Sequence, residues 1–583
     1  MPTLEWIGKD KVVNHHLEVP FRVLERKYSF DENGQHNEDN GSENMIIRGD
    51  NLEALKALLP RYEGRVKCIY IDPPYNTGNE GWVYNDNVND PKIKKWLGEV
   101  VGKEGEDLTR HDKWLCMMYP RLKLLQKLLA DDGVIFISID DTEYANLKLI
   151  CDEIFGSNCF VSNISWQRTY STRNDSKGIV NEVEHLVVYS KLPDWNPNKL
   201  PRTAEMDAKY KNPDNDHTLW RMSDAFAPGA ATHQGMVYAI QHPFTGKMLY
   251  PYNGSCWRYQ QDQMLEIMRG WCGYELRDLN DAHERAVVCG VPESDVRQGV
   301  QAIVLSESLE ISAQKAQAVY DRGQWPRFFF TKGGKGGIAR KTYLENVGGK
   351  LPTNFWAFTE TGHTDEAKKE MLAIFDGKAT FDTPKPHRLI EFVLTVAGNE
   401  NALVLDSFAG SGTTAHAVLN MNKADGGHRK FILVEMMDYA DSITAERVKR
   451  VIRGYGEGKN AVEGTGGNFS FYDLGEPLLH GDVLNENVGV EKIREYVYFT
   501  DTKASLPESH PDEPYFMGVH IGSAYYFYYE KQAVTTLNRE FLHTVKTEAD
   551  AYVIYADLCT LSEAELEKYH ITFKKIPRDI TKL

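Results

Sequence analysis

The chain has 583 residues, 42% of them hydrophobic and 26% charged, a composition that predicts an ordinary soluble protein of several domains. Its net charge of −17, taken alone, argues against a polyanionic partner. No apolar run is long enough to cross a bilayer, the N-terminus does not resemble a signal peptide, and the eight cysteines are scattered without a CxxC pair. We therefore expect a cytoplasmic protein with no membrane partner, no disulfide framework and no metal site.

The first part of the chain changes from a polar arm to alternating strands and helices. Residues 1–44 are polar and end in the turn-rich run DENGQHNEDNGSEN, which predicts a mobile arm or loop. The elements predicted after it are strands at 45–50, 66–72, 134–140 and 185–190 and helices at 51–62 and 122–130. This alternation indicates a parallel sheet with helices on both faces.

The alternation stops at residue 191 and resumes after residue 365. The later predicted elements are a helix at 386–397, a strand at 402–408, a helix at 412–422 and a strand at 430–436. From about residue 459 a glycine-rich joint leads into an acidic, strand-rich tail. Neither half-sheet buries enough apolar surface alone, so we expect one α/β core from residues 45–190 and 366–458. Residues 191–365 would then be an inserted domain and residues 459–583 a C-terminal α+β domain.

One predicted strand ends in the motif DPPY, at residues 72–75. The Asp72 carboxylate and the Pro73 carbonyl are hydrogen-bond acceptors, and neither Pro73 nor Pro74 has an amide N–H to compete with them. Tyr75 offers a flat aromatic face. Two acceptors beside an aromatic ring suit the exocyclic amine of a planar base. The lone pair of that amine is delocalised into the base, and accepting both of its N–H hydrogens draws the pair back onto the nitrogen.

A second motif, LDSFAGSGTT at 405–414, joins a predicted strand to a helix. The strand ends at Asp406, Gly410 and Gly412 let the backbone pass close to a ligand, and the helix begins near Thr413. The alternative is an ordinary strand–turn–helix corner. A phosphate loop is disfavoured, because no Gly-Lys-Thr follows.

Acids end two further predicted strands. Glu435 lies where such folds place a carboxylate on ribose hydroxyls, and Asp50 and Asn51 follow another strand. Either acid alone could be a helix cap or a solvated turn. Together with the two glycines they favour a nucleoside bound across adjacent strand ends.

The motifs DPPYNTG and FAGSGTT together resemble those of S-adenosylmethionine-dependent amino-methyltransferases of DNA, and their order resembles the β class. With RGDNLEALKAL, NEVEHLVVYSK and FDTPKPHRLIEFVL, the chain resembles the modification subunit of type III restriction–modification systems over about residues 45–440. The resemblance implies a circularly permuted, Rossmann-like class I methyltransferase sheet. Its catalytic half would be 45–190 and its cofactor half 366–458, with a target-recognition domain inserted between them.

The resemblance also implies a function and its site residues. It implies methyl transfer from S-adenosylmethionine to the N6 amine of adenine in double-stranded DNA, by a homodimer that associates with a restriction helicase–nuclease subunit. The implied catalytic residues are Asp72, Pro73, Pro74 and Tyr75, and the implied cofactor-binding residues are Asp50, Asn51, Lys385, Asp406, Phe408, Gly410, Gly412, Thr413 and Glu435.

The middle of the chain is less acidic than the rest. Residues 191–350 include 20 basic and 18 acidic residues, a balance of +2 that leaves −19 for the remainder. The run KGGKGGIARK at 332–341 follows the aromatic stretch WPRFFF and is either a solvated loop or a nucleic-acid contact. The candidates for DNA backbone contacts are Lys332, Lys335, Arg340 and Lys341.

Other readings of the same residues stay open. The two acceptors also suit the N4 amine of cytosine, although that group of enzymes more often has serine in place of Asp72. RNA methylation is disfavoured by the large insert. A non-catalytic DNA-recognition subunit is disfavoured by the intact motifs, and a Rossmann dehydrogenase leaves residues 72–75 without a purpose.

Overall fold

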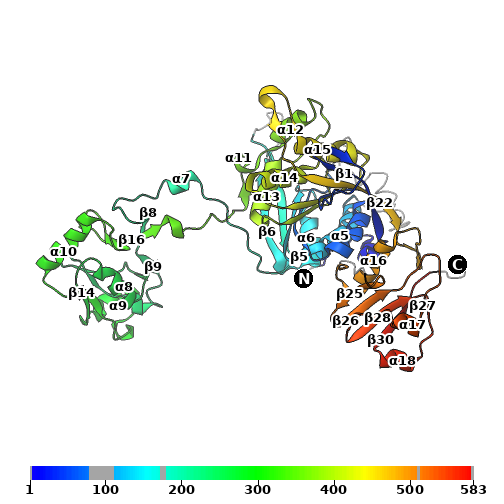
Figure 1. Cartoon of the computed structure of the whole chain (residues 1–583). Coiled ribbons are helices and arrows are strands. Elements are labelled where there is room, and N and C mark those ends of the chain that lie inside the picture. The colour runs from blue at the N-terminus through cyan, green and yellow to red at the C-terminus, as the bar shows by residue number, and fades with distance from the viewer. Residues whose placement is uncertain (1–2, 78–109, 171–178, 508–511, 579–583) are drawn as a thin grey trace. The chain divides into compact units, whose positions relative to one another are not determined.

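The structure is a computed structural model that describes residues 3–77, 110–170, 179–507 and 512–578 (Figure 1). The chain forms two compact units, which are described separately. Unit 1 comprises Met1–Asn198 and Pro352–Leu583, and unit 2 comprises Lys199–Leu351. Among the described residues, no helix combines the length and the apolar character needed to cross a membrane.

Unit 1 is built on one large sheet. Its strands are β1 (Arg22–Asp31), β2 (Gly34–His36), β3 (Met45–Arg48), β4 (Val66–Ile71), β5 (Leu129–Ile139), β6 (Phe160–Gln167), β7 (Val183–Ser190), β17 (Phe355–Trp356), β18 (Leu403–Asp406), β19 (Lys430–Glu435) and β22 (Asn468–Pro477). Their order across the sheet is β17-β6-β7-β5-β4-β18-β19-β3-β22-β1-β2. The strands β18 and β19 from the second half of the chain therefore lie between β3 and β4 from the first half, so neither half forms its sheet alone.

Helices cover both faces of the central strands. The main helices of unit 1 are α3 (Asn51–Tyr62), α5 (Arg110–Leu128), α6 (Tyr144–Phe155), α12 (Thr364–Ile374), α13 (His387–Ala397), α14 (Thr413–Asp425), α15 (Glu446–Arg453) and α16 (Val490–Thr502). In β4, Ile69 and Ile71 pack in one cluster with α3, α5 and α6. Cys68 and Tyr70 point to the opposite face and are also buried, and α13 contacts the same strand. Burial on both faces explains why the sequence of β4 is a continuous apolar run.

The α/β core is confirmed, with two local differences. The sheet is mixed, because β7 runs antiparallel to both β5 and β6. The helix predicted at 122–130 ends at Leu128, and β5 begins at Leu129 with an irregular register that absorbs Asp131 to Gly133. The turn signal in that stretch therefore marks a bulge and not a loop.

The prediction of a mobile arm or loop at 1–44 is wrong for residues 9–36, whereas residues 37–44 contain neither helix nor strand. Two short helices, α1 (Lys9–Val12) and α2 (His15–Glu18), come first, and Trp6, Val12 and Val19 are buried in the main cluster. Strand β1 then pairs antiparallel with β22. Strand β1 lies near the edge of the sheet, where Glu25 and Lys27 stay exposed to solvent, so its sequence is more polar than that of the central strands.

The start of the tail also belongs to the main sheet, since β22 pairs parallel with β3. Beyond it, α16 is followed by a second sheet in the order β25-β26-β28-β30, visible in orange and red in Figure 1. These strands are β25 (Phe516–His520), β26 (Ser523–Phe527), β28 (Ala551–Ala556) and β30 (Ile571–Lys575), accompanied by α18 (Glu563–Lys568).

Unit 2 is a smaller mixture of short strands and helices around its own hydrophobic cluster. Its main elements are β8 (Trp220–Asp224), β12 (Ser255–Trp257), α8 (Gln261–Arg269), β13 (Tyr274–Arg277), α9 (Ala282–Cys289), β14 (Ala302–Leu305), α10 (Leu309–Arg322), β15 (Phe328–Phe330) and β16 (Ile338–Tyr343). At its two ends, Leu200 and Lys350 exchange backbone hydrogen bonds of 2.7 and 2.9 Å. We call this pairing the clasp. Residues 191–198 and 352–365 fall in unit 1.

Candidate active site

Four neighbouring parallel strands end at the same edge of the sheet of unit 1. They are β4, β18, β19 and β3, and the acids predicted from the sequence follow or end them. A pocket opens at this edge. The predicted residues that line it are Asn51, Asp72, Pro74, Lys385, Asp406, Phe408, Gly410, Thr413 and Glu435.

Two buried carboxylates hold the loop after β18. Asp406 accepts hydrogen bonds from the Phe408 amide at 3.0 Å and the Thr414 hydroxyl at 2.6 Å. Glu435 accepts one from the Gly410 amide at 2.8 Å. Burial raises the pKa of both Asp406 and Glu435 to about 7, although these hydrogen bonds oppose the shift. Both acids therefore stabilise the shape of the loop as well as facing the pocket.

The loop requires its glycines for different reasons. Gly410 and Gly412 have φ angles of 51° and 80°, a left-handed conformation that residues with a side chain rarely adopt. A Cβ atom on Gly412 would also lie 2.9 Å from the backbone oxygen of Thr444, whereas one on Gly410 would meet the Phe381 ring at 3.2 Å. A side chain would therefore be tolerated less well at position 412 than at position 410.

Asp50 and Asn51 connect the end of β3 to the pocket. Asp50 caps α3 by accepting from the Leu52 amide at 2.8 Å, and Arg121 lies 3.3 Å from its other oxygen. Asn51 donates to the Ser407 carbonyl at 3.1 Å and accepts from Arg121. In this structure Asp50 is a helix cap, and its contact with a cofactor stays a prediction.

Lys385 lies between the predicted catalytic residues. Its Nζ is 2.8 Å from each carboxylate oxygen of Asp72, 2.9 Å from the Tyr75 hydroxyl and 5.0 Å from the centre of the Tyr75 ring. The Tyr75 hydroxyl also lies 2.9 Å from Asp72 Oδ1. The acceptors of Asp72 are thus engaged, and the ammonium covers the ring predicted to face a base.

The charges of this group stabilise one another. Burial raises the pKa of Asp72, and Lys385 opposes the rise. Burial alone would lower the pKa of Lys385, but Asp72 and Glu184 outweigh it and raise the pKa. The Pro74 carbonyl accepts from the Trp114 indole at 2.7 Å.

Sequence reasoning missed a second carboxylate beside this group. Glu184 on β7 is 7% exposed, and its Oε2 lies 3.1 Å from the Tyr75 hydroxyl and 3.5 Å from Lys385 Nζ. Its Oε1 accepts from Arg168 at 2.8 Å. Burial alone would raise the pKa of Glu184, but Lys385 and Arg168 outweigh it and lower the pKa. Glu184 is part of the motif NEVEHLVVYSK, but nothing in that run distinguishes it from its neighbour Glu182.

Arg447 on α15 was also missed. It is fully buried and donates to the Ser411 and Thr413 hydroxyls at 2.9 and 2.8 Å, behind the glycine-rich loop. Its other end contacts Glu370 at 3.0 Å and His416 at 3.1 Å. Glu370, His387 and His416 bring ligand atoms within 4.8 Å of one another, but the Arg447 guanidinium already supplies the cation of this cluster.

The pocket fits S-adenosylmethionine by the chemistry of its lining. Phe381, Phe408 and Met436 supply apolar walls for a purine ring, and the carboxylates of Asp406 and Glu435 can accept from ribose hydroxyls and offset a cationic group. Asp72 lines the same pocket, so an acceptor molecule at the catalytic motif would meet the cofactor there.

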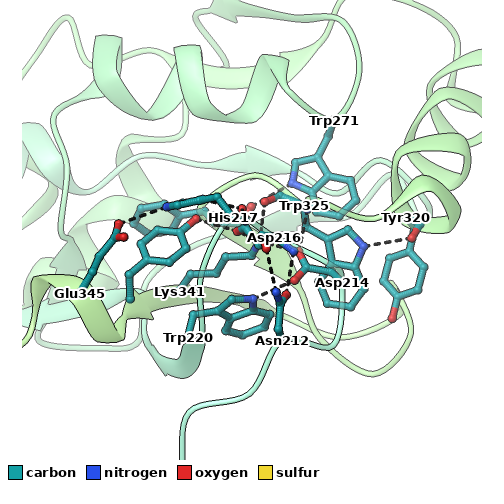
Figure 2. Close-up of polar contacts among 12 residues, drawn as sticks. Asn212, Asp214, Asp216, His217, Trp220, Trp271, Tyr320, Trp325, Lys341 and Glu345 are labelled. Carbon is teal, nitrogen blue, oxygen red and sulfur yellow. Dashed lines mark hydrogen bonds and ion pairs between the residues drawn. The ribbon is translucent and has the colours of Figure 1, made fainter.

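The predicted DNA contact at Lys341 is wrong. Figure 2 shows its side chain in the interior of unit 2, where it is 0% exposed. Its ammonium bonds to Asp214 and Asp216, and to the Trp325 carbonyl at 2.7 Å. Strand β16 turns successive side chains to opposite faces, so a basic run in the sequence does not form one basic surface.

The other three predicted contacts keep accessible side chains. Lys332 and Lys335 are exposed in the turn between β15 and β16, and Arg340 is half-buried. Burial together with the neighbouring Arg258 and Arg327 lowers the pKa of Arg340. Among the described residues, Arg258, Arg327 and Arg340 form no ion pair with an acid, and Arg258 and Arg327 are exposed. We call Arg258, Arg327 and Arg340 the arginine patch.

The chain resembles known DNA methylases in sequence. It matches the family model described as DNA methylase over residues 66–446. It is 33% identical over 477 residues to the type III restriction-modification enzyme StyLTI Mod subunit of Salmonella typhimurium LT2, covering 77% of this chain and 62% of that one. It is 30% identical over 399 residues to the type II methyltransferase M.KpnI of Klebsiella pneumoniae, covering 68% of this chain and 81% of that one. Among solved structures, the PvuII DNA methyltransferase (cytosine-N4-specific) aligns with a TM-score of 0.31 at 13% identity, covering 70% and 86%. The chain thus spans less than two thirds of the Mod subunit.

Proposed function

Because this chain belongs to the DNA methylase family, we propose that it transfers a methyl group from S-adenosylmethionine to the N6 amine of adenine in double-stranded DNA. One observation carries the proposal. Asp72 of the DPPY motif and Gly410 of the glycine-rich loop line the same pocket, although they come from different halves of the sequence. A methyl donor held by the loop and an amine held by the motif would therefore be adjacent, which is the main requirement of a direct transfer.

S-adenosylmethionine supplies an activated methyl group when it is bound. Glu435, Asp406 and the loop around Gly410 would hold its nucleoside and methionine parts, with Phe408 against them. Asn51 and Arg121 would hold the end of α3 beside the cofactor.

The target adenine must leave the duplex, because its amine is paired inside it. Asp72 and the carbonyl of Pro73 would accept the two amine hydrogens, and Asp72 would take the proton that the nitrogen loses when it gains a carbon. Tyr75 would orient the base through its ring once Lys385 has moved from it. The same acceptors suit the N4 amine of cytosine, which is the alternative acceptor.

Unit 2 would recognise the DNA. The arginine patch and the exposed Lys332 and Lys335 offer positive charge without acidic partners, as phosphate contacts require. These contacts would position the duplex. The residues that read bases would lie elsewhere in unit 2.

The wider setting follows from the relatives. Since the StyLTI Mod subunit is part of a restriction-modification enzyme, we infer that this chain protects cellular DNA in the bacterial or archaeal cytoplasm. A homodimer and a restriction helicase–nuclease subunit are the partners we propose. The alternative to an enzymatic function is that the chain is a non-catalytic DNA-recognition subunit.

One experiment tests the proposal. The chain is expressed in a host without other methylases, and the host DNA is sequenced by a method that reports modified bases. We expect N6-methyladenine in one short sequence context, and none with Asp72→Ala. N4-methylcytosine would favour the alternative acceptor, and unmodified DNA from an expressed chain that binds S-adenosylmethionine would favour a recognition subunit.

A further inference from the structure

The catalytic group contains charged residues that the proposed methyl transfer does not use. Asp72, Lys385, Glu184 and Arg168 form a row in which acids and bases alternate, with Lys385 2.8 Å from Asp72 and 3.5 Å from Glu184. Glu184 does not line the cofactor pocket, as judged from the described residues. Its carboxylate reaches the site only through Lys385 and the Tyr75 hydroxyl.

The arrangement poses a problem for the entering base. The amine needs an oxygen of Asp72, but Lys385 bonds both oxygens and the Tyr75 hydroxyl lies against one of them. Oδ1 accepts two hydrogen bonds and Oδ2 accepts one, so the amine would share Oδ2 with an ammonium that also weakens Asp72 as a proton acceptor. We therefore expect Lys385 to leave Asp72. A buried ammonium without a partner is strongly unfavourable, so it requires another carboxylate at hand. Among the described residues, Glu184 is the only other carboxylate within 4 Å of Lys385 Nζ.

We propose that Glu184 is the positioning residue that receives Lys385 when the target amine enters, so that Asp72 is released for the amine while the ammonium stays paired. This inference rests on the proposed function. The ammonium moves between two carboxylates that already face it, and the pocket keeps the same total charge. Asp72 regains a lone pair, which can then accept the proton that leaves the amine nitrogen.

The first test compares Glu184→Gln in two backgrounds, by single-turnover methylation of the site found by sequencing. In the otherwise wild-type chain it should slow transfer by about 10- to 100-fold, the effect of losing one charged hydrogen bond. In a Lys385→Met background it should cause no further loss and should raise the rate at acidic pH, because removing a like charge lowers the pKa of Asp72. Equal slowing in both backgrounds would overturn the inference.

The second test needs no chemistry. DNA affinity is measured with S-adenosylhomocysteine present, for duplexes carrying adenine or unsubstituted purine at the target position. Purine lacks the amine that competes with Lys385 for Asp72, so Glu184→Gln should weaken binding of the adenine duplex relative to the purine duplex. An unchanged ratio of the two affinities would overturn the proposal.

Two controls keep the outcomes separate. Glu182→Gln, two residues away and just before the same strand, should behave as the wild type in both tests. Calorimetry with S-adenosylmethionine should show unchanged cofactor affinity for Glu184→Gln. A wild-type chain that does not methylate DNA would refute the proposed function itself. If the wild-type chain methylates DNA and the Glu184→Gln variant does so at the same rate, only the role of Glu184 is overturned.

Discussion

Replacing Lys341 with methionine should destabilise unit 2 without weakening its electrostatic attraction to DNA. The side chain is 0% exposed, and so is that of its partner Asp214. Methionine has a similar length and removes only the charge. Removing one member of a buried ion pair costs about 3–5 kcal/mol, because the remaining acids stay buried without a cation. At about 2–4 °C per kcal/mol for a domain of this size, the unfolding temperature of unit 2 should fall by about 6–20 °C.

Scanning calorimetry of the full chain at several pH values measures this effect. Burial alone would raise the pKa of Asp216, but hydrogen bonds from Lys341 and His217 outweigh it and lower the pKa. A carboxyl with a lowered pKa stabilises the fold above its unfolded value of about 3.9 and loses that contribution as the pH falls. The difference in unfolding temperature between wild type and Lys341→Met should therefore become smaller at acidic pH. Lys332→Met, at an exposed position, is the matched control and should change the free energy of unfolding by no more than about 0.5 kcal/mol. An unchanged unfolding temperature, together with a flatter salt dependence of DNA binding, would refute the structural role of Lys341.

Three further predictions concern the candidate active site and the proposed DNA contacts of unit 2. Asp72→Ala should abolish methyl transfer in a filter assay while calorimetry shows near-normal affinity for S-adenosylmethionine; retained turnover would contradict the catalytic assignment. Gly412→Ala should lower both cofactor affinity and stability. A residue with a side chain in this left-handed conformation costs about 1–2 kcal/mol, and the new Cβ would meet the Thr444 oxygen. Unchanged affinity in calorimetry would place the cofactor elsewhere. Replacing Arg258 and Arg327 by alanine should weaken binding to every duplex alike and reduce the salt slope by about 0.9 for each phosphate that is no longer neutralised, whereas a changed target sequence would mean that they read bases.

The sequence predicted the strand ends of the site because local patterns encode them. The apolar run of β4 stops at the two prolines, and the glycines after β18 mark a close backbone turn. Parallel strands end at one edge, so residues placed at strand ends in the sequence also meet in space. Most of the predicted cofactor residues line the pocket for this reason.

What the sequence did not predict depends on pairing between distant residues. Glu184 meets Lys385, 201 positions later in the chain, and nothing local to either residue records that contact. Lys341 is buried because Asp214 and Asp216 approach it from another part of unit 2, whereas composition alone made it look exposed. The polar segment at 1–44 failed as a prediction for a related reason, since a strand near the sheet edge resembles a loop in composition until its partner β22 is known.

The clasp at the ends of unit 2 has a consequence for how such proteins diversify. Leu200 and Lys350 hold the incoming and outgoing segments together by backbone hydrogen bonds, which do not depend on side chains. The return segment then adds β17 to β6 in the sheet of unit 1, again through the backbone. A gene segment encoding everything between the two ends could thus be exchanged by recombination without altering the register of the catalytic sheet. With unit 2 in the role proposed for it, target preference would be inherited as a module that passes between lineages, independently of the sheet in unit 1.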